Sequence, residues 1–238
     1  MAYRLNKVLL NRLTIPWRPF YRRYPYAGHV SINSADARGL VDLELGVFCN
    51  RIPKAANSTV VTNLARLSHG QHVRSYAAKR MYRTPATLST DEVARFDDLF
   101  KFVVVRNPFS RTLSAYLEKI ERRAEQKGRQ TSFREFLEQA RDGALYSNAH
   151  WAPQSDLLLI PVEKFDYIGK VESLEHDLAV IKHRIRPDQP LPVTSARGHA
   201  TGASSKLARY YEPDLIDMVR QLYQRDFELF GYSTDLPV

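Results

Sequence analysis

The chain has 238 residues, of which 44% are hydrophobic and 26% are charged, with a formal net charge of +9. This is a globular composition, which excludes a disordered chain, and the positive charge indicates an anionic partner such as a nucleotide, an acidic polysaccharide, nucleic acid or a membrane surface. The lone Cys49 excludes an internal disulfide framework and suits a reducing compartment.

The N-terminal residues 1–44 are rich in Arg, Tyr and Pro and show little periodicity. Charged residues and Pro16 interrupt the start of the chain, leaving no signal-peptide core and no apolar run of the ~20 residues needed to cross a bilayer. We therefore expect a soluble, cytoplasmic chain without a transmembrane segment. The basic and aromatic stretch RPFYRRYPY (residues 18–26) either stacks on bases or sugars or forms a loop packed on the domain surface, and we favour the loop.

The remaining chain alternates between strand and helix patterns. Residues 45–51 predict a buried strand and residues 58–67 a helix. The strongest strand is LFKFVVVRN (residues 99–107), a β-branched run of the kind that is buried on both faces of a parallel sheet. Asn107 and Pro108 are typical of a helix start, and that helix is predicted to continue to about Lys127, before Gly128.

Further predicted elements are helices over 133–140, 174–184 and 213–227, strands over 157–160 and 165–172, and a loop over 186–206. This order predicts a single domain, 1–238, with an α/β fold. We expect a P-loop-like three-layer arrangement in which helices flank a central, mostly parallel sheet.

The segment RIPKAANSTVV (residues 51–61) joins the first predicted strand to its helix. In that arrangement, free backbone N–H groups and the helix dipole face an anion. Lys54 adds a positive charge, Ala55 and Ala56 permit close approach, and Asn57, Ser58 and Thr59 offer further donors. The loop lacks the glycines of a Walker loop. The alternatives are an ordinary turn with a solvated lysine, or a glycosylation sequon at Asn57, which we take to be accidental.

The second predicted strand ends in Arg106, where a nucleotide triphosphatase usually places a Mg²⁺-binding Asp. A cation in that position favours direct, metal-free binding of an anion. Arg111 and Ser114 follow on one helix face, so that Arg106 with Ser114 could chelate a second phosphate. We find no set of residues with metal-ligand spacing and expect no metal. The competing interpretation is that Arg106 caps carbonyl groups or pairs with a surface carboxylate.

PKAANST and FVVVRNPFSRTLSAY together resemble the 5′-phosphosulfate and 3′-phosphate motifs of sulfotransferases that use 3′-phosphoadenosine 5′-phosphosulfate (PAPS). The sequence is most similar to carbohydrate sulfotransferases of the chondroitin, dermatan and glucuronyl-glycan type. The similarity continues through NAHWAPQSDL, FDYIGKVESLEHDLAVI and LYQRDFELFGY, in family order. It defines a family-like core over 45–232, preceded by the basic and aromatic segment 1–44.

The resemblance implies a role for each matching residue. Lys54 would contact the sulfate and the bridging oxygen, and Ala55, Ala56, Asn57, Ser58 and Thr59 would cradle the 5′-phosphate. Arg106 and Ser114 would bind the 3′-phosphate. Arg197, in the Ser/Gly-rich loop after Pro192, would belong to a loop that closes over the cofactor.

Sulfuryl transfer needs a base for the acceptor hydroxyl. His150, in NAHWAPQ, is our first candidate because its ordinary pKa suits proton abstraction near neutrality, and His72 is the alternative. The competing interpretation of His150 is a structural histidine hydrogen-bonded beneath Trp151.

The sequence thus predicts a sulfotransferase that moves sulfate from PAPS to a hydroxyl, with adenosine 3′,5′-bisphosphate as product. The acceptor is expected to be a carbohydrate, and an acidic polysaccharide would suit the net charge; we expect no nucleic-acid partner. Family members in animal cells are Golgi-anchored, so a chain trimmed of its anchor would belong in the Golgi lumen. The rivals are a P-loop kinase using ATP and Mg²⁺, and a non-catalytic polyanion-binding module.

Overall fold

The computed structural model describes residues 13–70, 73–121, 131–188 and 202–237. Four strands form a single sheet within them, in the spatial order β1-β2-β3-β4. Strands β2, β3 and β4 are parallel, and β1 is antiparallel to β2. The strands are β1 (Gly39–Asp42), β2 (Val47–Asn50), β3 (Phe100–Val105) and β4 (Tyr167–Lys170). The predicted α/β fold with a mostly parallel sheet is confirmed.

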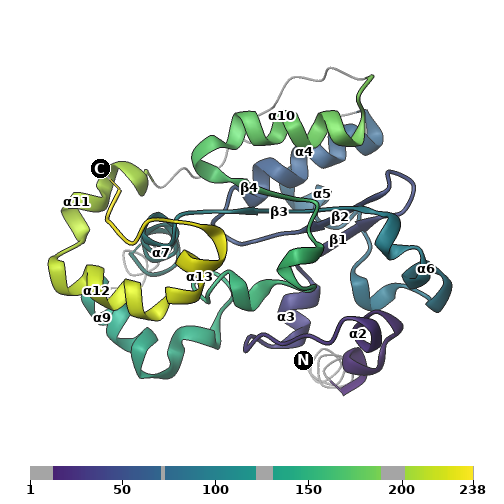
Figure 1. Cartoon of the computed structure of the whole chain (residues 1–238). Coiled ribbons are helices and arrows are strands. Elements are labelled where there is room, and N and C mark those ends of the chain that lie inside the picture. Colours follow the sequence, from purple (N-terminus) through teal and green to yellow (C-terminus); the bar gives the residue numbers. More distant parts are fainter. Residues whose placement is uncertain (1–12, 71–72, 122–130, 189–201, 238) are drawn as a thin grey trace.

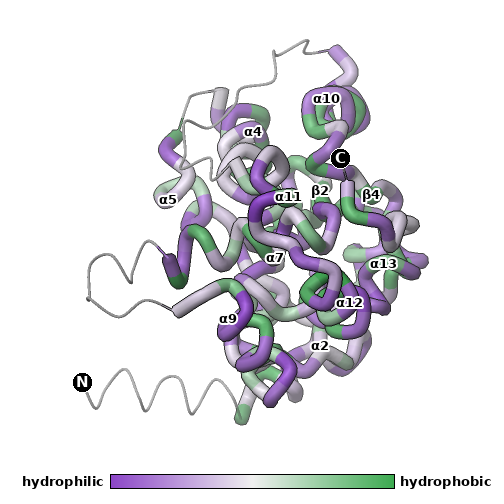
Figure 2. The backbone as a smooth tube through the Cα atoms, turned by 90° about the vertical axis from the view of Figure 1, so that its left-hand side faces the viewer, coloured by the Kyte–Doolittle hydropathy of each residue, from purple (hydrophilic) through white to green (hydrophobic). Residues whose placement is uncertain are grey.

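Helices cover both faces of this sheet (Figure 1). Helices α4 and α10 lie on one face, while α3, α7 and α13 lie on the other, and the view in Figure 2 agrees with this layering. The α-helices are α2 (Pro19–Arg23), α3 (Ile32–Asp36), α4 (Asn57–His69), α5 (Ser75–Ala78), α6 (Thr90–Ala94), α7 (Pro108–Tyr116), α9 (Phe133–Gln139), α10 (Leu174–Ile185), α11 (Leu207–Tyr210), α12 (Pro213–Leu222) and α13 (Gln224–Phe230). None of the helices in the described ranges is both long and apolar enough to span a bilayer.

Alternating side chains of the central strands build the two sides of the core. Phe102 and Val104 of β3, together with Cys49 of β2, pack with the apolar faces of α4 and α10. Val103 and Val105 point to the opposite side, where they pack with residues of the loop after β2. Five of the six residues of β3 are buried, which explains why its sequence reads as a continuous apolar run.

The predicted strand over residues 157–160 is wrong. Ser155–Leu157 forms a 3₁₀ turn, and the residues after it are not in a strand. The cause is the buried side chain of Asn50, whose amide donates to the carbonyl of Leu157 at 3.0 Å and accepts from the N–H of Leu159 at 2.8 Å. One side chain therefore satisfies the backbone groups that a neighbouring strand would otherwise pair.

Two predicted helices have different ends. The helix after Asn107 leaves the α-helical geometry at Tyr116 and continues as a π-helical segment, Leu117–Glu121, and its predicted remainder lies outside the described residues. The helix over 213–227 is two helices, α12 and α13, which meet at Tyr223. The break places the Tyr223 hydroxyl on the carbonyl of Trp151 at 2.7 Å.

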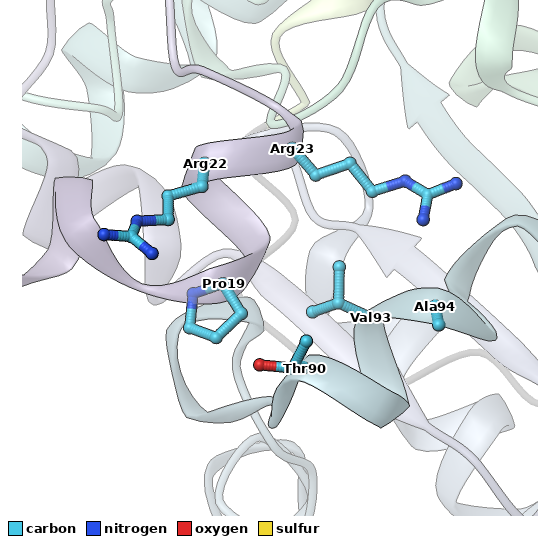
Figure 3. Close-up of a pocket in the computed structure, with 6 residues that line it drawn as sticks. All are labelled: Pro19, Arg22, Arg23, Thr90, Val93 and Ala94. Carbon is cyan, nitrogen blue, oxygen red and sulfur yellow. The ribbon is translucent and has the colours of Figure 1, made fainter.

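The stretch at residues 18–26 is not a loop, since α2 spans five of its residues. Its packing on the domain is as predicted, because Phe20, Tyr21 and Tyr24 are buried against Phe48 and Phe96. These rings are therefore not free to stack on a ligand. A shallow hollow between α2 and α6 is drawn in Figure 3, and neither helix carries a predicted site residue. The hollow is lined by Pro19, Arg22, Arg23, Thr90, Val93 and Ala94.

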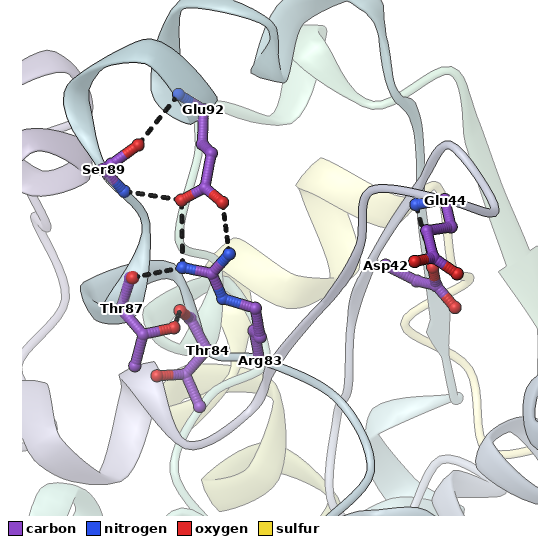
Figure 4. Close-up of polar contacts among 7 residues, drawn as sticks. All are labelled: Asp42, Glu44, Arg83, Thr84, Thr87, Ser89 and Glu92. Atoms are coloured by element: carbon purple, nitrogen blue, oxygen red, sulfur yellow. Dashed lines mark hydrogen bonds and ion pairs between the residues drawn. The ribbon is translucent and has the colours of Figure 1, made fainter.

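The elements between residues 73 and 98 were not predicted from the sequence. Helix α6 starts with a capping box, in which Ser89 and Glu92 bind each other's backbone N–H groups. Arg83 donates to the Glu92 carboxylate and to the carbonyl of Thr87, which anchors this segment (Figure 4). The Ser-Thr-Asp-Glu pattern at residues 89–92 was the available sequence signal.

Candidate functional site

The ends of β2 and β3 bring two predicted site residues together. These strands are parallel, with Asn50 opposite Val103, so the segments that follow them leave the same edge of the sheet. Lys54 lies in the loop after β2, and Arg106 directly follows β3. The guanidinium of Arg106 donates through Nη1 to the Lys54 carbonyl at 3.3 Å. The two cations, each from the segment that follows one of two neighbouring strands, therefore border one site.

The loop after β2 takes a left-handed backbone without glycine. Lys54 has a φ of 69° and Ala56 a φ of 50°, whereas Ala55 between them does not have a positive φ. Each left-handed residue with a side chain costs roughly 1–2 kcal/mol. An alternation of this kind can turn backbone N–H groups toward an anion, and α4 begins directly behind the loop, while the N–H of Ala55 donates to the Ile52 carbonyl at 3.3 Å. Asn57, Ser58 and Thr59, in the first turn of α4, are partly exposed.

The Lys54 side chain reaches the π-helical segment that follows α7 and is only 9% exposed. Its ammonium contacts the carboxylate of Glu118, whose other oxygen lies 3.0 Å from the ammonium of Lys119. Burial lowers the pKa of Lys54, and Glu118 opposes that shift. Burial alone would raise the pKa of Glu118, but the hydrogen bonds from the two lysines hold it at about 2. Glu118 was missed, although it stands four residues after Ser114 on the same helical line.

Arg106 is held at both its backbone and its side chain. Its Nε donates to Ser110 Oγ at 2.9 Å, and Nη2 donates to Ser204 Oγ at 3.1 Å. The backbone N–H and carbonyl of Arg106 pair with the amide of Gln154, at 2.9 and 2.8 Å. Ser114, the predicted partner, is 2% exposed and lies one helical turn beyond Ser110. Burial lowers the pKa of Arg106.

Gln154 is positioned in turn by the C-terminal helix. The carboxylate of Asp226 in α13 accepts from the N–H groups of Gln154 and Ser155 at 2.7 and 2.8 Å. Both Asp226 and Gln154 are fully buried. The end of β3 is thereby tied to an element more than a hundred residues away along the chain.

Arg111 joins the loop to the segment around His150. Its guanidinium is 1% exposed and donates to the carbonyls of Pro53 at 3.0 Å, Ala152 at 2.7 Å and Ala149 at 3.2 Å. Burial lowers the pKa of Arg111. The side chain was expected only to share a helix face with Ser114. In the structure it fixes the relative position of two chemically important segments.

His150 has a defined tautomer. Asn148 Oδ1 accepts from the backbone N–H of His150 at 3.0 Å, which identifies that atom as the amide oxygen. The same oxygen lies 2.8 Å from His150 Nδ1, which must therefore carry the proton, leaving Nε2 as the acceptor. Burial, together with the charges of Lys119, Arg38 and Lys54, lowers the pKa of His150 to about 3. His72 and Arg197 lie outside the described residues.

A second group of cations lies on the β1 side of the loop. The Arg51 N–H donates to the Arg38 carbonyl at 2.9 Å, and neither Nε atom has a hydrogen-bond partner in the described parts of the chain. Burial, with a contribution from Arg38, lowers the pKa of Arg51 to about 10. Burial lowers the pKa of Lys79 too, and both arginines add to that shift. No cluster of three or more His, Cys, Asp or Glu residues that could hold a metal ion occurs among the described residues.

Comparisons with known proteins agree with this geometry. A family model described as "Sulfotransferase family" matches residues 39–233. Carbohydrate sulfotransferase 14 of Danio rerio is 27% identical over 165 residues, which cover 58% of this chain and 45% of that protein. The matched region thus spans less than half the length of this curated relative. No solved structure matches the chain.

The left-handed geometry of the loop predicts opposite effects for two neighbouring glycine substitutions. Ala56→Gly should raise the free energy of unfolding by up to about 1 kcal/mol, because glycine removes the left-handed strain. Ala55→Gly should lower it by about 1 kcal/mol, because the buried methyl is lost and the unfolded chain gains freedom. Chemical denaturation measures both values, and equal losses of stability in the two variants would contradict the described loop.

Proposed function

The chain belongs to the sulfotransferase family, and from this premise we propose that it transfers the sulfuryl group of PAPS to a hydroxyl of a carbohydrate. The observation that carries the proposal is the meeting of Lys54 and Arg106 at the ends of β2 and β3. Adenosine 3′,5′-bisphosphate would be the product. The comparisons offer no support for the kinase or for the polyanion-binding module.

The residues at this site fit PAPS. The left-handed backbone of the loop, the start of α4 and the small side chains of Ala55 and Ala56 would allow a 5′-phosphate to approach backbone N–H groups. Arg106 and Ser110 lie at its β3 side, with Ser114 a turn further along α7, which suits the 3′-phosphate. We keep Asn57, Ser58, Thr59 and Arg197 as proposed cofactor-binding residues. PAPS, when bound, supplies an activated sulfuryl group.

Within this proposal, Lys54 places its ammonium beside the developing negative charge. Positive charge held in a partly buried site stabilises such charge better than the same group does in water. Since the backbone of Lys54 is held by Arg106, the origin of its side chain is fixed.

We propose His150 as the base that accepts the proton of the acceptor hydroxyl. Its Nδ1–H donates to Asn148, so the free lone pair is on Nε2, and the low pKa keeps the ring neutral at physiological pH. Burial lowers the pKa of His150 most, and the surrounding cations lower it further. An anionic cosubstrate would neutralise part of their charge and raise the pKa of His150 toward its ordinary value. His72 stays the alternative.

We further propose that the acceptor carries negative charge. Arg38 precedes β1 and Arg51 follows β2, and a backbone hydrogen bond joins them. Both arginines contribute, after burial, to the lowered pKa of Lys79, whereas the proposed 3′-phosphate group, Arg106 and its serines, follows β3. Arg51 is buried and its Nη atoms donate to Asn57 Oδ1 and to the Ala37 carbonyl, so Arg38 and Lys79, which are partly exposed, would supply the positive charge that contacts an acceptor. A cytoplasmic setting and a single domain over 1–238 stay predictions from the sequence.

The first prediction from the proposed function concerns the cofactor site. Lys54→Ala and Arg106→Ala should each lower sulfate transfer by at least about 100-fold, since each removes a charge that faces the cofactor. Calorimetry with adenosine 3′,5′-bisphosphate should show binding without metal that weakens in Arg106→Ala. The exposed Arg141→Ala variant is the control, because the ion pair that Arg141 makes within the described parts of the chain is with its neighbour Asp142. Binding of ATP–Mg²⁺ alone would favour the kinase, and polyanion binding that survives Lys54→Ala would favour the binding module.

The second prediction concerns the base. His150→Ala should lower turnover by about 10²–10⁴-fold while leaving the affinity for adenosine 3′,5′-bisphosphate unchanged. Asn148→Leu should also lower turnover, because Nδ1 loses the acceptor that defines its proton, and Asn148→Asp should retain more activity. In NMR titrations the His150 ring should stay neutral to about pH 4, since its pKa is about 3. Unchanged turnover in His150→Ala would move the role to His72.

The third prediction concerns the acceptor. Lys79→Met should raise KM for a hexasaccharide of alternating uronic acid and N-acetylhexosamine by about 3- to 10-fold, the range expected for one partly exposed charge contact. The same variant should leave KM unchanged for the carboxyl-reduced hexasaccharide. Arg22→Met, which removes an exposed charge from α2, is the matched control for net charge. An equal change in KM for both hexasaccharides would contradict an anionic acceptor.

A further inference from the structure

Glu118 is a carboxylate placed within a site that is otherwise suited to anions. It lies in the π-helical segment Leu117–Glu121, which directly follows α7. Such segments interrupt the regular helix and occur frequently at functional sites. Its carboxylate contacts the Lys54 ammonium, and the exposures of the two side chains are 28% and 9%. A bare carboxylate here would repel a phosphosulfate, so its presence needs a physical reason.

The charged groups that face Lys54 come from several elements. Burial is the main cause that lowers the pKa of Lys54, and Arg106, at the end of β3, and Lys119, in the π-helical segment, lower it further. His150 lies close enough for its own pKa to be lowered by Lys54. Glu118 opposes all of these influences. Without it, a buried lysine beside two cations would tend to lose its proton.

We propose that Glu118 is a positioning residue, which keeps the Lys54 side chain charged and holds its ammonium in place for the 5′-phosphosulfate. This inference rests on the proposed function. An ammonium group has three N–H donors, so Lys54 can hold Glu118 and still offer donors to an anion. Lys119 binds the second carboxylate oxygen at 3.0 Å and offsets the charge of Glu118. The row Lys119–Glu118–Lys54 thus keeps a net positive charge, and Glu118 need not leave when an anion binds.

The direct test is an NMR titration of lysine Cε carbons in the whole protein, with Lys54→Arg used to assign the Lys54 signal. In Glu118→Gln, which keeps the side-chain shape and removes the charge, Lys54 should lose its proton at a lower pH than in the wild type. Glu118→Asp should restore most of the difference. The matched control is Glu121→Gln, which removes the same charge from the same segment. Glu121 accepts a hydrogen bond from the Tyr210 hydroxyl, so this variant should leave the Lys54 titration unchanged. An unchanged Lys54 titration in Glu118→Gln would overturn the proposal.

The kinetic test is the alkaline limb of kcat/KM for PAPS. The ratio of kcat/KM at about pH 9 to that at about pH 7 should fall about tenfold in Glu118→Gln, as expected for a tenfold change in the protonated fraction of Lys54. In a Lys54→Arg background, the same substitution should leave this ratio unchanged, since a guanidinium stays protonated. A merely structural role of Glu118 would lower kcat/KM equally at both pH values and would contradict the inference.

The two proposals can fail separately. Absence of binding to adenosine 3′,5′-bisphosphate in the wild type would overturn the proposed function, while the NMR titration would still decide whether Glu118 keeps Lys54 charged. Normal sulfate transfer with an unchanged Lys54 titration in Glu118→Gln would overturn only the role of Glu118.

Discussion

The site depends on the burial of one guanidinium. Arg111 binds carbonyls from two segments, the loop that contains Lys54 and the turn that contains His150. No single apolar contact could define their separation as closely, because three directional hydrogen bonds constrain both position and orientation. Removing a charge from water is costly, and charge-assisted bonds to carbonyls offset part of that cost. Packing elsewhere in the fold must offset the remaining free-energy cost of burying this charge.

A second connection links the site to the end of the chain. Asp226 binds the backbone of Gln154, and the side chain of Gln154 binds the backbone of Arg106. Helix α13 therefore contributes to the site through the backbone of Gln154. The break at Tyr223 makes this possible, because a continuous helix would not turn α13 in this way. A motif such as DFELFGY (residues 226–232) can thus be typical of a family because it positions the site, as Asp226 does through Gln154.

Local sequence was sufficient for the parts of the structure that depend on local patterns. The β-branched run of β3, the Asn107-Pro108 helix start and the segment from β2 into α4 were all predicted, and with them the juxtaposition of Lys54 and Arg106. The failures share a different cause. The 157–160 segment has strand-like residues, but its backbone is bonded by the side chain of Asn50, and no pattern within the segment could reveal that.

Glu118 and the left-handed loop were missed because both depend on contacts between distant residues. A positive φ at Lys54 and Ala56 contradicts the local preference of these residue types, so only the surrounding packing can impose it. Cys49 illustrates a further consequence of that packing. It is 1% exposed in β2, and burial raises its pKa to about 12, so the thiol is chemically inert while the sheet is closed. The rate at which a thiol reagent labels this cysteine therefore measures how often the strand that carries the loop opens to solvent, and a ligand that stabilises the closed sheet would slow that labelling.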